Sequence, residues 1–142
     1  MRENAEILLV DDNPADIELT RDSLGPFQIQ AAKDGVEAIA FLRLRAESAN
    51  ATMPDLVFLD LNMPRKDGRA VLAEVKSDPR LRTIPIVVFT ASRAFPDISK
   101  SYELGANCFV TKPATLPEFM AAVKSIEYFW LNAASLPQRE ES

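Results

Sequence analysis

Short runs of apolar residues alternate along this chain with longer segments in which apolar residues recur at helical spacing. The clearest run is Ile7-Leu8-Leu9-Val10, which has no polar interruption and is typical of a strand buried on both faces of a sheet. Asp11-Asp12-Asn13-Pro14 ends the run, and helical spacing begins at Pro14. This alternation predicts βα units and therefore an α/β domain with a parallel sheet.

Continued along the chain, the pattern predicts five strands and five helices. The predicted strands cover residues 7–10, 27–31, 55–59, 84–89 and 107–110. The predicted helices cover residues 14–24, 35–46, 68–77, 95–104 and 116–131. A polar loop is expected over 46–54 and a frayed end over 136–142. We expect one domain over 1–142, with a core of about 6–131 and a C-terminal tail from 132.

Composition narrows the possible functions. A chain of 142 residues with 47% hydrophobic residues fits one domain with a real core. The net charge of -5 argues against a direct nucleic-acid interface, which needs clustered basic residues. The start shows no signal peptide and no apolar run approaches the ~20 residues that span a bilayer, so we expect a cytoplasmic protein without a membrane segment. With no histidine and only Cys108, the sequence excludes an internal disulfide, the usual zinc ligands and Cys/His or Ser/His catalysis, and Cys108 itself is expected to be a small buried hydrophobe.

Polar residues with possible chemistry follow several of the predicted strands. In an open parallel α/β sheet, ligands bind outside the carboxyl ends of the strands. Asp11 and Asp12 follow the first strand and Asp60 ends the third, so three carboxylates converge if those strands are neighbours. Such a group needs a cation, and hard carboxylate oxygens suit Mg²⁺.

The ends of the last two strands supply complementary groups. Lys112 can reach over the same crevice, and Thr90 offers a hydroxyl, so Asp60 could act as a nucleophile toward a phosphoryl group and form an aspartyl phosphate. Each residue also has an ordinary interpretation: 11–14 as a helix cap and turn, Lys112 as a solvated charge, Thr90 as a strand residue, and Asp60 as a loop acid. Their joint placement at four strand ends favours a site.

The motifs closely resemble the receiver domain of two-component response regulators, across about residues 6–130. The matching pieces are Ile7-Leu8-Leu9-Val10-Asp11-Asp12, Asp60-Leu61-Asn62-Met63-Pro64, Asp67-Gly68, Thr90-Ala91 and Lys112-Pro113, in the family's order. The resemblance implies a doubly wound, flavodoxin-like five-stranded parallel sheet of order 2-1-3-4-5 with five helices. It also implies a stoichiometric switch that catalyses only its own phosphorylation and dephosphorylation.

Residue roles follow from the resemblance position by position. Asp60 would accept a phosphoryl group from a histidine kinase, while Thr90 and Lys112 would bind that group. The metal ligands would be Asp11, Asp12, Asp60 and the backbone carbonyl of Asn62, with Mg²⁺ as the ion. The switch would couple Thr90 to Phe109, which lacks the hydroxyl of the more usual tyrosine. The Lys112–Pro113 peptide would be cis, and Asn62 and Ser92 would tune the lifetime of the phosphate.

The loop before Pro54, the segment 106–113 and the ending 125–131 are similar to the small regulators paired with bacterial phytochromes. This implies a phytochrome-type, light-sensing histidine kinase as partner and a homodimer through the face formed by the fourth helix, fifth strand and fifth helix. On that last helix, helical spacing predicts one stripe facing the sheet: Leu116, Phe119, Val123, Ile126 and Trp130. Tyr128, Phe129 and Leu131 lie off the stripe and could join Phe95 and Ile98 in an apolar patch or pack under the tail.

Three alternatives stay open. The chain could be a degenerate receiver used only as a binding scaffold. An aspartate-nucleophile phosphatase would also use an aspartate and magnesium on a parallel sheet, with a nucleophile after the first strand and a second acid two residues later; Asn13 stands at that second position. A flavin-binding module would need an uncharged, hydroxyl-rich loop where Asp11 and Asp12 stand.

Overall fold

The computed structural model describes residues 4–50 and 52–137. Five parallel strands form one sheet in the order β2-β1-β3-β4-β5, which confirms the predicted doubly wound topology. The strands are β1 (Glu6–Val10), β2 (Gln28–Ala32), β3 (Leu56–Leu59), β4 (Ile86–Thr90) and β5 (Cys108–Thr111). All five run in the same direction, so their carboxyl ends meet at one edge of the sheet.

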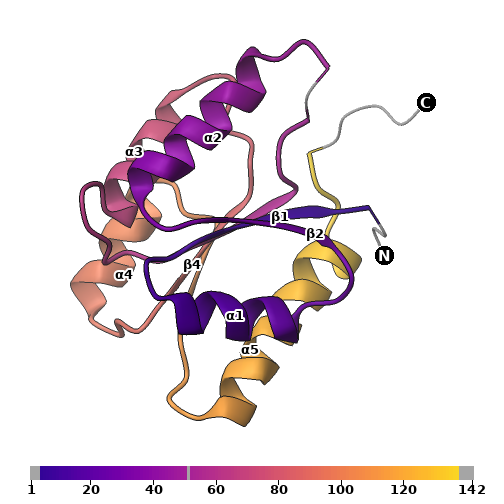
Figure 1. The fold of residues 1–142 in the computed structure, drawn as a ribbon. Helices are drawn as coiled ribbons and strands as arrows, with labels where there is room; N and C mark the ends of the chain where they lie inside the picture. Colours follow the sequence, from indigo (N-terminus) through magenta and orange to yellow (C-terminus); the bar gives the residue numbers. More distant parts are fainter. Residues whose placement is uncertain (1–3, 51, 138–142) are drawn as a thin grey trace.

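Five α-helices cover the two faces of the sheet. They are α1 (Pro14–Ser23), α2 (Gly35–Glu47), α3 (Gly68–Ser77), α4 (Phe95–Glu103) and α5 (Leu116–Tyr128). Figure 1 shows α1 and α5 on one face and α2 and α3 on the other. Within the described residues, none of these helices is long and apolar enough to cross a bilayer.

The alternation of side chains along each strand divides the core between these two faces. Leu8 and Val10 of β1 belong to the cluster under α2 and α3, whereas Ile7 and Leu9 belong to the cluster under α1 and α5. All five residues of β1 are buried. An apolar run without alternation is therefore explained by a central strand that is covered on both sides.

Most element boundaries agree with the sequence prediction to within two residues, but α5 ends three residues earlier than predicted. At β4 the difference has a physical cause. This strand begins at Ile86, two residues later than predicted, because the Ile84 amide donates to the Leu81 carbonyl in a turn at 3.0 Å. Pro85 then has no amide proton to donate to the sheet.

The end of α5 departs from the predicted helical stripe. A π-helical turn, η1 (Phe129–Ala133), follows α5, and its larger number of residues per turn rotates the later side chains relative to an α-helix. Leu131, predicted to lie off the stripe, is 2% exposed in the core, whereas Leu116, predicted to face the sheet, is 56% exposed at the first turn. Leu136 is also buried, so the expected frayed end at 136–142 is wrong at this residue; residues 138–142 lie outside the described part of the chain.

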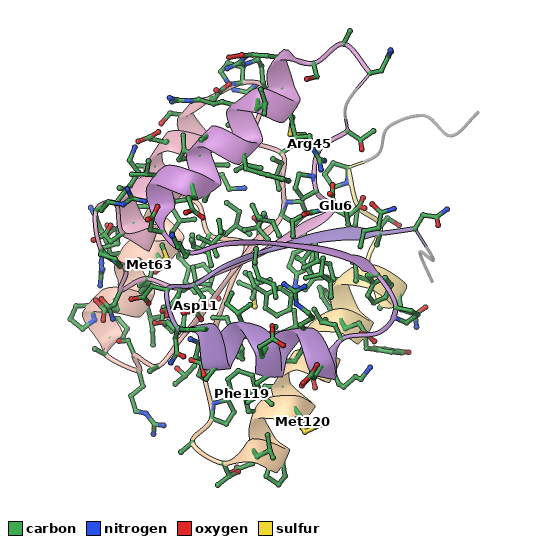
Figure 2. All side chains as sticks on the ribbon, in the orientation of Figure 1. Glu6, Asp11, Arg45, Met63, Phe119 and Met120 are labelled. Atoms are coloured by element: carbon green, nitrogen blue, oxygen red, sulfur yellow. The ribbon has the colours of Figure 1, made fainter. Side chains whose placement is uncertain are left out.

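The amino ends of the strands carry a structural ion pair far from the polar strand ends. Arg45 of α2 donates to both carboxylate oxygens of Glu6 at 2.6 and 2.7 Å and to the carbonyl of Thr52 at 2.8 Å. Figure 2 shows Glu6 and Arg45 together, with Asp11 at the other end of β1. This pair connects the segment after α2 to β1, at the edge of the sheet opposite Asp11.

Gly68 is required for close packing between α3 and the end of β3. A Cβ atom at this position would lie 2.2 Å from the backbone carbonyl oxygen of Asp60. We expect Gly68→Ala to destabilise the protein by roughly 3 kcal/mol in urea unfolding, because rigid backbone must move. Gly25→Ala is the matched control, since its nearest contact would be the movable ring of Phe27 at 3.2 Å. Equal unfolding midpoints for the two variants would contradict this assignment.

Candidate functional site: a carboxylate cluster around Lys112

Three carboxylates meet at the carboxyl edge of the sheet, as the sequence predicts. β1 and β3 are hydrogen-bonded neighbours with Val10 opposite Leu59, so the residues that follow them lie side by side. Asp11, Asp12 and Asp60 each offer a carboxylate oxygen within 4.8 Å of the others. The Leu61 amide donates to Asp60 Oδ1 at 2.7 Å and fixes the orientation of that carboxylate.

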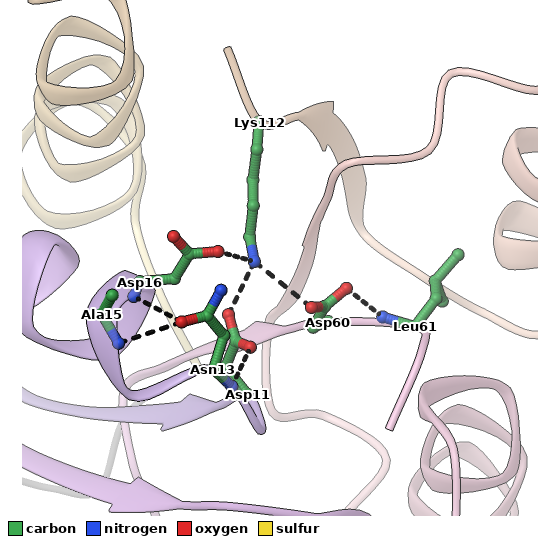
Figure 3. Close-up of polar contacts among 7 residues, drawn as sticks. All are labelled: Asp11, Asn13, Ala15, Asp16, Asp60, Leu61 and Lys112. Atoms are coloured by element: carbon green, nitrogen blue, oxygen red, sulfur yellow. Dashed lines mark hydrogen bonds and ion pairs between the residues drawn. The ribbon is translucent and has the colours of Figure 1, made fainter. Parts of the chain in front are cut away.

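Lys112 brings a buried positive charge to this cluster. Its Nζ lies 2.7 Å from Asp11 Oδ2, 2.8 Å from Asp16 Oδ2 and 3.2 Å from Asp60 Oδ2 (Figure 3). The lysine side chain is only 7% exposed. Burial alone would lower the pKa of Lys112, but the hydrogen bonds to Asp11 and Asp16 and the charges of Asp11 and Asp60 outweigh burial and raise it. Lys112 therefore stays protonated in this environment.

In the turn after β1, the residue that caps α1 is Asn13 and not Asp11 or Asp12. Asn13 is the N-cap of α1, and its Oδ1 accepts the amide protons of Ala15 and Asp16 at 3.0 and 3.3 Å. Pro14 occupies the first helical position, where no amide proton is needed. The cap interpretation of this segment is thus correct for Asn13. Asp11 Oδ1 also accepts the Asn13 amide proton at 3.0 Å in this turn, while its Oδ2 accepts a hydrogen bond from Lys112.

Asp16 is the carboxylate partner of Lys112 that the sequence pattern did not predict. It lies in the first turn of α1, and its carboxylate reaches back to Lys112. The available signal is its helical position: side chains in a helix lean toward the N-terminus, which here faces the edge of the sheet. An acid in a first helical turn also has an ordinary role near the positive end of the helix dipole, which masks its second contact.

The remaining predicted residues surround the cluster. Thr90 ends β4 and is 1% exposed, and its Oγ1 has no hydrogen-bond partner among the described residues. A buried hydroxyl without a partner is costly, so its placement is consistent with a group reserved for a ligand.

Asn62 is exposed beyond Asp60. Ser92 Oγ donates to Asp97 Oδ2 at 2.5 Å, and Arg69 donates to Asp97 Oδ1 at 2.6 Å, which ties the β4–α4 loop to α3.

Two expectations near β5 have different outcomes. Phe109 is half-buried against the cluster under α2 and α3, and its amide donates to Tyr102 Oη at 3.1 Å. Its proposed coupling to Thr90 stays a prediction. The expected cis peptide between Lys112 and Pro113 is wrong, because the described residues contain no cis peptide bond; Lys112 nevertheless points into the cluster.

The donor set fits a hard divalent cation. Four carboxylates face one ammonium group, so the cluster carries excess negative charge. Burial raises the pKa of Asp11 from 3.8 to about 6, although hydrogen bonds from Lys112 and Asn13 oppose this rise. A divalent cation held by Asp11, Asp12 and Asp60 would relieve the excess charge with oxygen ligands alone.

The fold and the site together define a receiver-type phosphorylation switch. Residues 7–124 match the family model described as the response regulator receiver domain, and the chain belongs to this family. Receiver domains act as phosphoacceptor switches in two-component signalling, take phosphoryl groups from histidine kinases and bind divalent metal ions. The resemblance read from the strand-end motifs is therefore confirmed.

Individual relatives are close to this chain over almost its whole length. Response regulator Rcp1 of Synechocystis sp. is 44% identical over 135 residues, which cover 92% of each chain. The structure of the phosphorylated cyanobacterial phytochrome response regulator RcpA has 50% identity and a TM-score of 0.89, covering 95% of this chain and 99% of its own. The Mn²⁺-bound form of Rcp1 has 43% identity and a TM-score of 0.86, covering 94% and 99%.

The raised pKa of Asp11 predicts a specific pH dependence without divalent cations. A carboxyl that binds its proton more tightly in the folded than in the unfolded state stabilises the protein at low pH. This contribution is lost as the pH rises from about 4 through 6. We therefore expect the unfolding free energy of wild type to fall by on the order of 2 kcal/mol between pH 4 and 7 relative to Asp11→Asn.

Urea unfolding at several pH values measures this difference. Asp22→Asn is the control for loss of one carboxylate, because Asp22 is exposed on the same helix. Parallel profiles for wild type and Asp11→Asn would show that burial of Asp11 does not affect its proton affinity.

Proposed function

We propose that Asp60 is the phosphoacceptor of this receiver, with Mg²⁺ as its metal ion. The observation that carries the proposal is the placement of a lysine ammonium, a partnerless buried hydroxyl and a three-carboxylate cluster around one aspartate. Asp60 is partly exposed, so a donor can reach it, whereas Asp11 beside it is buried.

The residues support an in-line transfer to Asp60. A carboxylate oxygen of Asp60 would form a bond to phosphorus while the bond from phosphorus to the donor breaks and the donor leaves with its electron pair. Lys112 and the Thr90 hydroxyl would compensate charge on the phosphoryl oxygens. Mg²⁺ bound by Asp11, Asp12, Asp60 and the Asn62 carbonyl would supply further charge compensation. The described chain would then act as a stoichiometric switch that catalyses only its own phosphorylation and dephosphorylation.

The proposed donor is a phytochrome-type histidine kinase. Support comes from the similarity to RcpA, which is described as a cyanobacterial phytochrome response regulator, and from 44% identity to Rcp1. Receiver domains take phosphoryl groups from histidine kinases, so a phosphohistidine on such a kinase would be the donor.

Intact-protein mass spectrometry tests the phosphoacceptor directly. Wild type incubated with acetyl phosphate and Mg²⁺ is expected to gain one phosphoryl group, and a chelator or Asp60→Asn should abolish this gain. Asp55→Asn, which changes a buried aspartate at the other end of β3, is the matched control and should still be modified if it folds. Modification of Asp60→Asn to the wild-type level would refute the assignment, and an autophosphorylated phytochrome-type kinase used as donor in the same assay tests the partner.

Two other functions give different outcomes in that assay. A degenerate receiver would gain no phosphoryl group from any donor. An aspartate-nucleophile phosphatase would show multiple turnover on a small phosphoester. The position two residues after Asp11 does not favour the phosphatase, because Asn13 is engaged as the cap of α1.

We further propose that the signal leaves through the α4-β5-α5 face and that this face pairs with a second copy of the chain. Phe95 of α4 is 76% exposed, and Tyr102 is 49% exposed. Tyr128, the last residue of α5, is 62% exposed, and Phe129, the first residue of η1, is 53% exposed. Apolar and aromatic side chains without a covering element are typical of association surfaces.

Light scattering on a sizing column tests this pairing. Phosphorylated wild type is expected to elute as a dimer, and Phe95→Ser should shift it toward the monomer because it removes exposed apolar surface from the pairing face. Leu44→Ser is the matched control, because Leu44 is 68% exposed on α2, outside this face. Identical elution of all three proteins as monomers would contradict pairing.

A further inference from the structure

Asp16 has no assigned part in the phosphorylation chemistry, yet it forms one of the three hydrogen bonds of the Lys112 ammonium. An ammonium group has three N–H donors, and the three carboxylates of Asp11, Asp16 and Asp60 use them all. Asp11 and Asp60 belong to the cluster that fits a metal, whereas Asp16 does not. Asp16 is therefore the one partner of Lys112 whose carboxylate is not needed elsewhere in the site.

We propose that Asp16 is a positioning residue that draws the Lys112 ammonium toward α1 and thereby weakens the hold on a phosphoryl group at Asp60. This inference rests on the proposed function of Asp60. Asp16 acts through Lys112, because its own carboxylate has no direct contact with Asp60 in the structure.

Competition for hydrogen-bond donors is the first reason. To bind a phosphoryl oxygen, Lys112 must release a donor from one of its three present partners. The contact to Asp16 at 2.8 Å is shorter than the contact to Asp60 at 3.2 Å, so the ammonium is held more closely by α1 than by the phosphoacceptor. The Asp16 carboxylate can still accept this hydrogen bond from Lys112 after Asp60 has been phosphorylated.

Charge repulsion is the second reason, and it acts in the same direction. The carboxylates of Asp16 and Asp60 both lie about 3 Å from one Nζ atom, so they are no more than about 6 Å apart. A phosphoryl group on Asp60 adds negative charge at this short distance. Repulsion between charges at such a separation in a partly buried site corresponds to about a tenfold change in affinity.

Loss of Asp16 would not leave Lys112 misplaced. Asp11 Oδ2 and Asp60 Oδ2 would still accept two of its three hydrogen bonds, and the lysine side chain is 7% exposed and confined by its surroundings. The released donor would then be available to the phosphoryl group. Removal of the Asp16 charge is therefore expected to tighten anion binding rather than to weaken it.

Calorimetric titration of wild type and Asp16→Asn separates these effects, with beryllofluoride as the phosphoryl probe at saturating Mg²⁺. We expect Asp16→Asn to bind beryllofluoride about tenfold more tightly and Mg²⁺ alone about threefold more weakly. The opposite signs distinguish an electrostatic role from a structural one, because a damaged site would bind both probes more weakly. Asp22→Asn removes an exposed carboxylate farther along α1 and should bind both probes like wild type.

Asp16→Ser provides a second variant that removes the charge with a different side chain, and thermal unfolding verifies that each variant is folded. Unchanged or weaker beryllofluoride binding in both folded variants would overturn the role of Asp16 while leaving the proposed function intact. Failure of wild type to bind beryllofluoride would overturn the proposed phosphoacceptor and this inference together.

Discussion

The buried ammonium of Lys112 among carboxylates from separate elements is the interaction on which the site depends. Lys112 follows β5, while its partners follow β1 and β3 or lie on α1, so its side chain crosses the end of β4. The small residues Thr90 and Ala91 stand at that crossing. Removing one partner from a buried ion pair leaves an uncompensated charge, which is far more costly than losing an exposed pair. The order of the strands therefore determines which carboxylates lie close enough to balance the charge of Lys112.

Most of the fold could be predicted from sequence because the signals are local and repeated. An uninterrupted apolar run such as 7–10 is typical of a strand buried on both faces, and helical spacing between such runs predicts crossover connections. The convergence of Asp11, Asp60 and Lys112 needs two facts: parallel strands end at the same edge of the sheet, and β1 and β3 are neighbours. The first follows from the alternating pattern, whereas the strand order came from the family resemblance.

The parts that sequence did not reveal depend on geometry finer than the helical period. Asp16 reaches Lys112 because its side chain leans back from the first turn of α1, a direction that spacing alone does not encode. Leu131 enters the core because one π-helical turn changes the residue-to-angle relation after Tyr128. In both cases the contact depends on the direction of a side chain relative to the helix axis, which the pattern of residue types does not specify.

The site has more carboxylates than ammonium groups. Under the proposed function, this excess would determine the order in which ligands bind. With four carboxylates against one ammonium, an incoming phosphoryl group meets net repulsion until a divalent cation has bound. The Thr90 hydroxyl, which has no hydrogen-bond partner among the described residues, would gain an acceptor when the phosphoryl group arrives. Under the proposed function, metal binding, phosphorylation and reorientation of Thr90 would form a sequence in which each step creates the electrostatic or hydrogen-bonding condition for the next. A buried hydroxyl at the end of β4 can in this way report the chemical state of a carboxylate on β3.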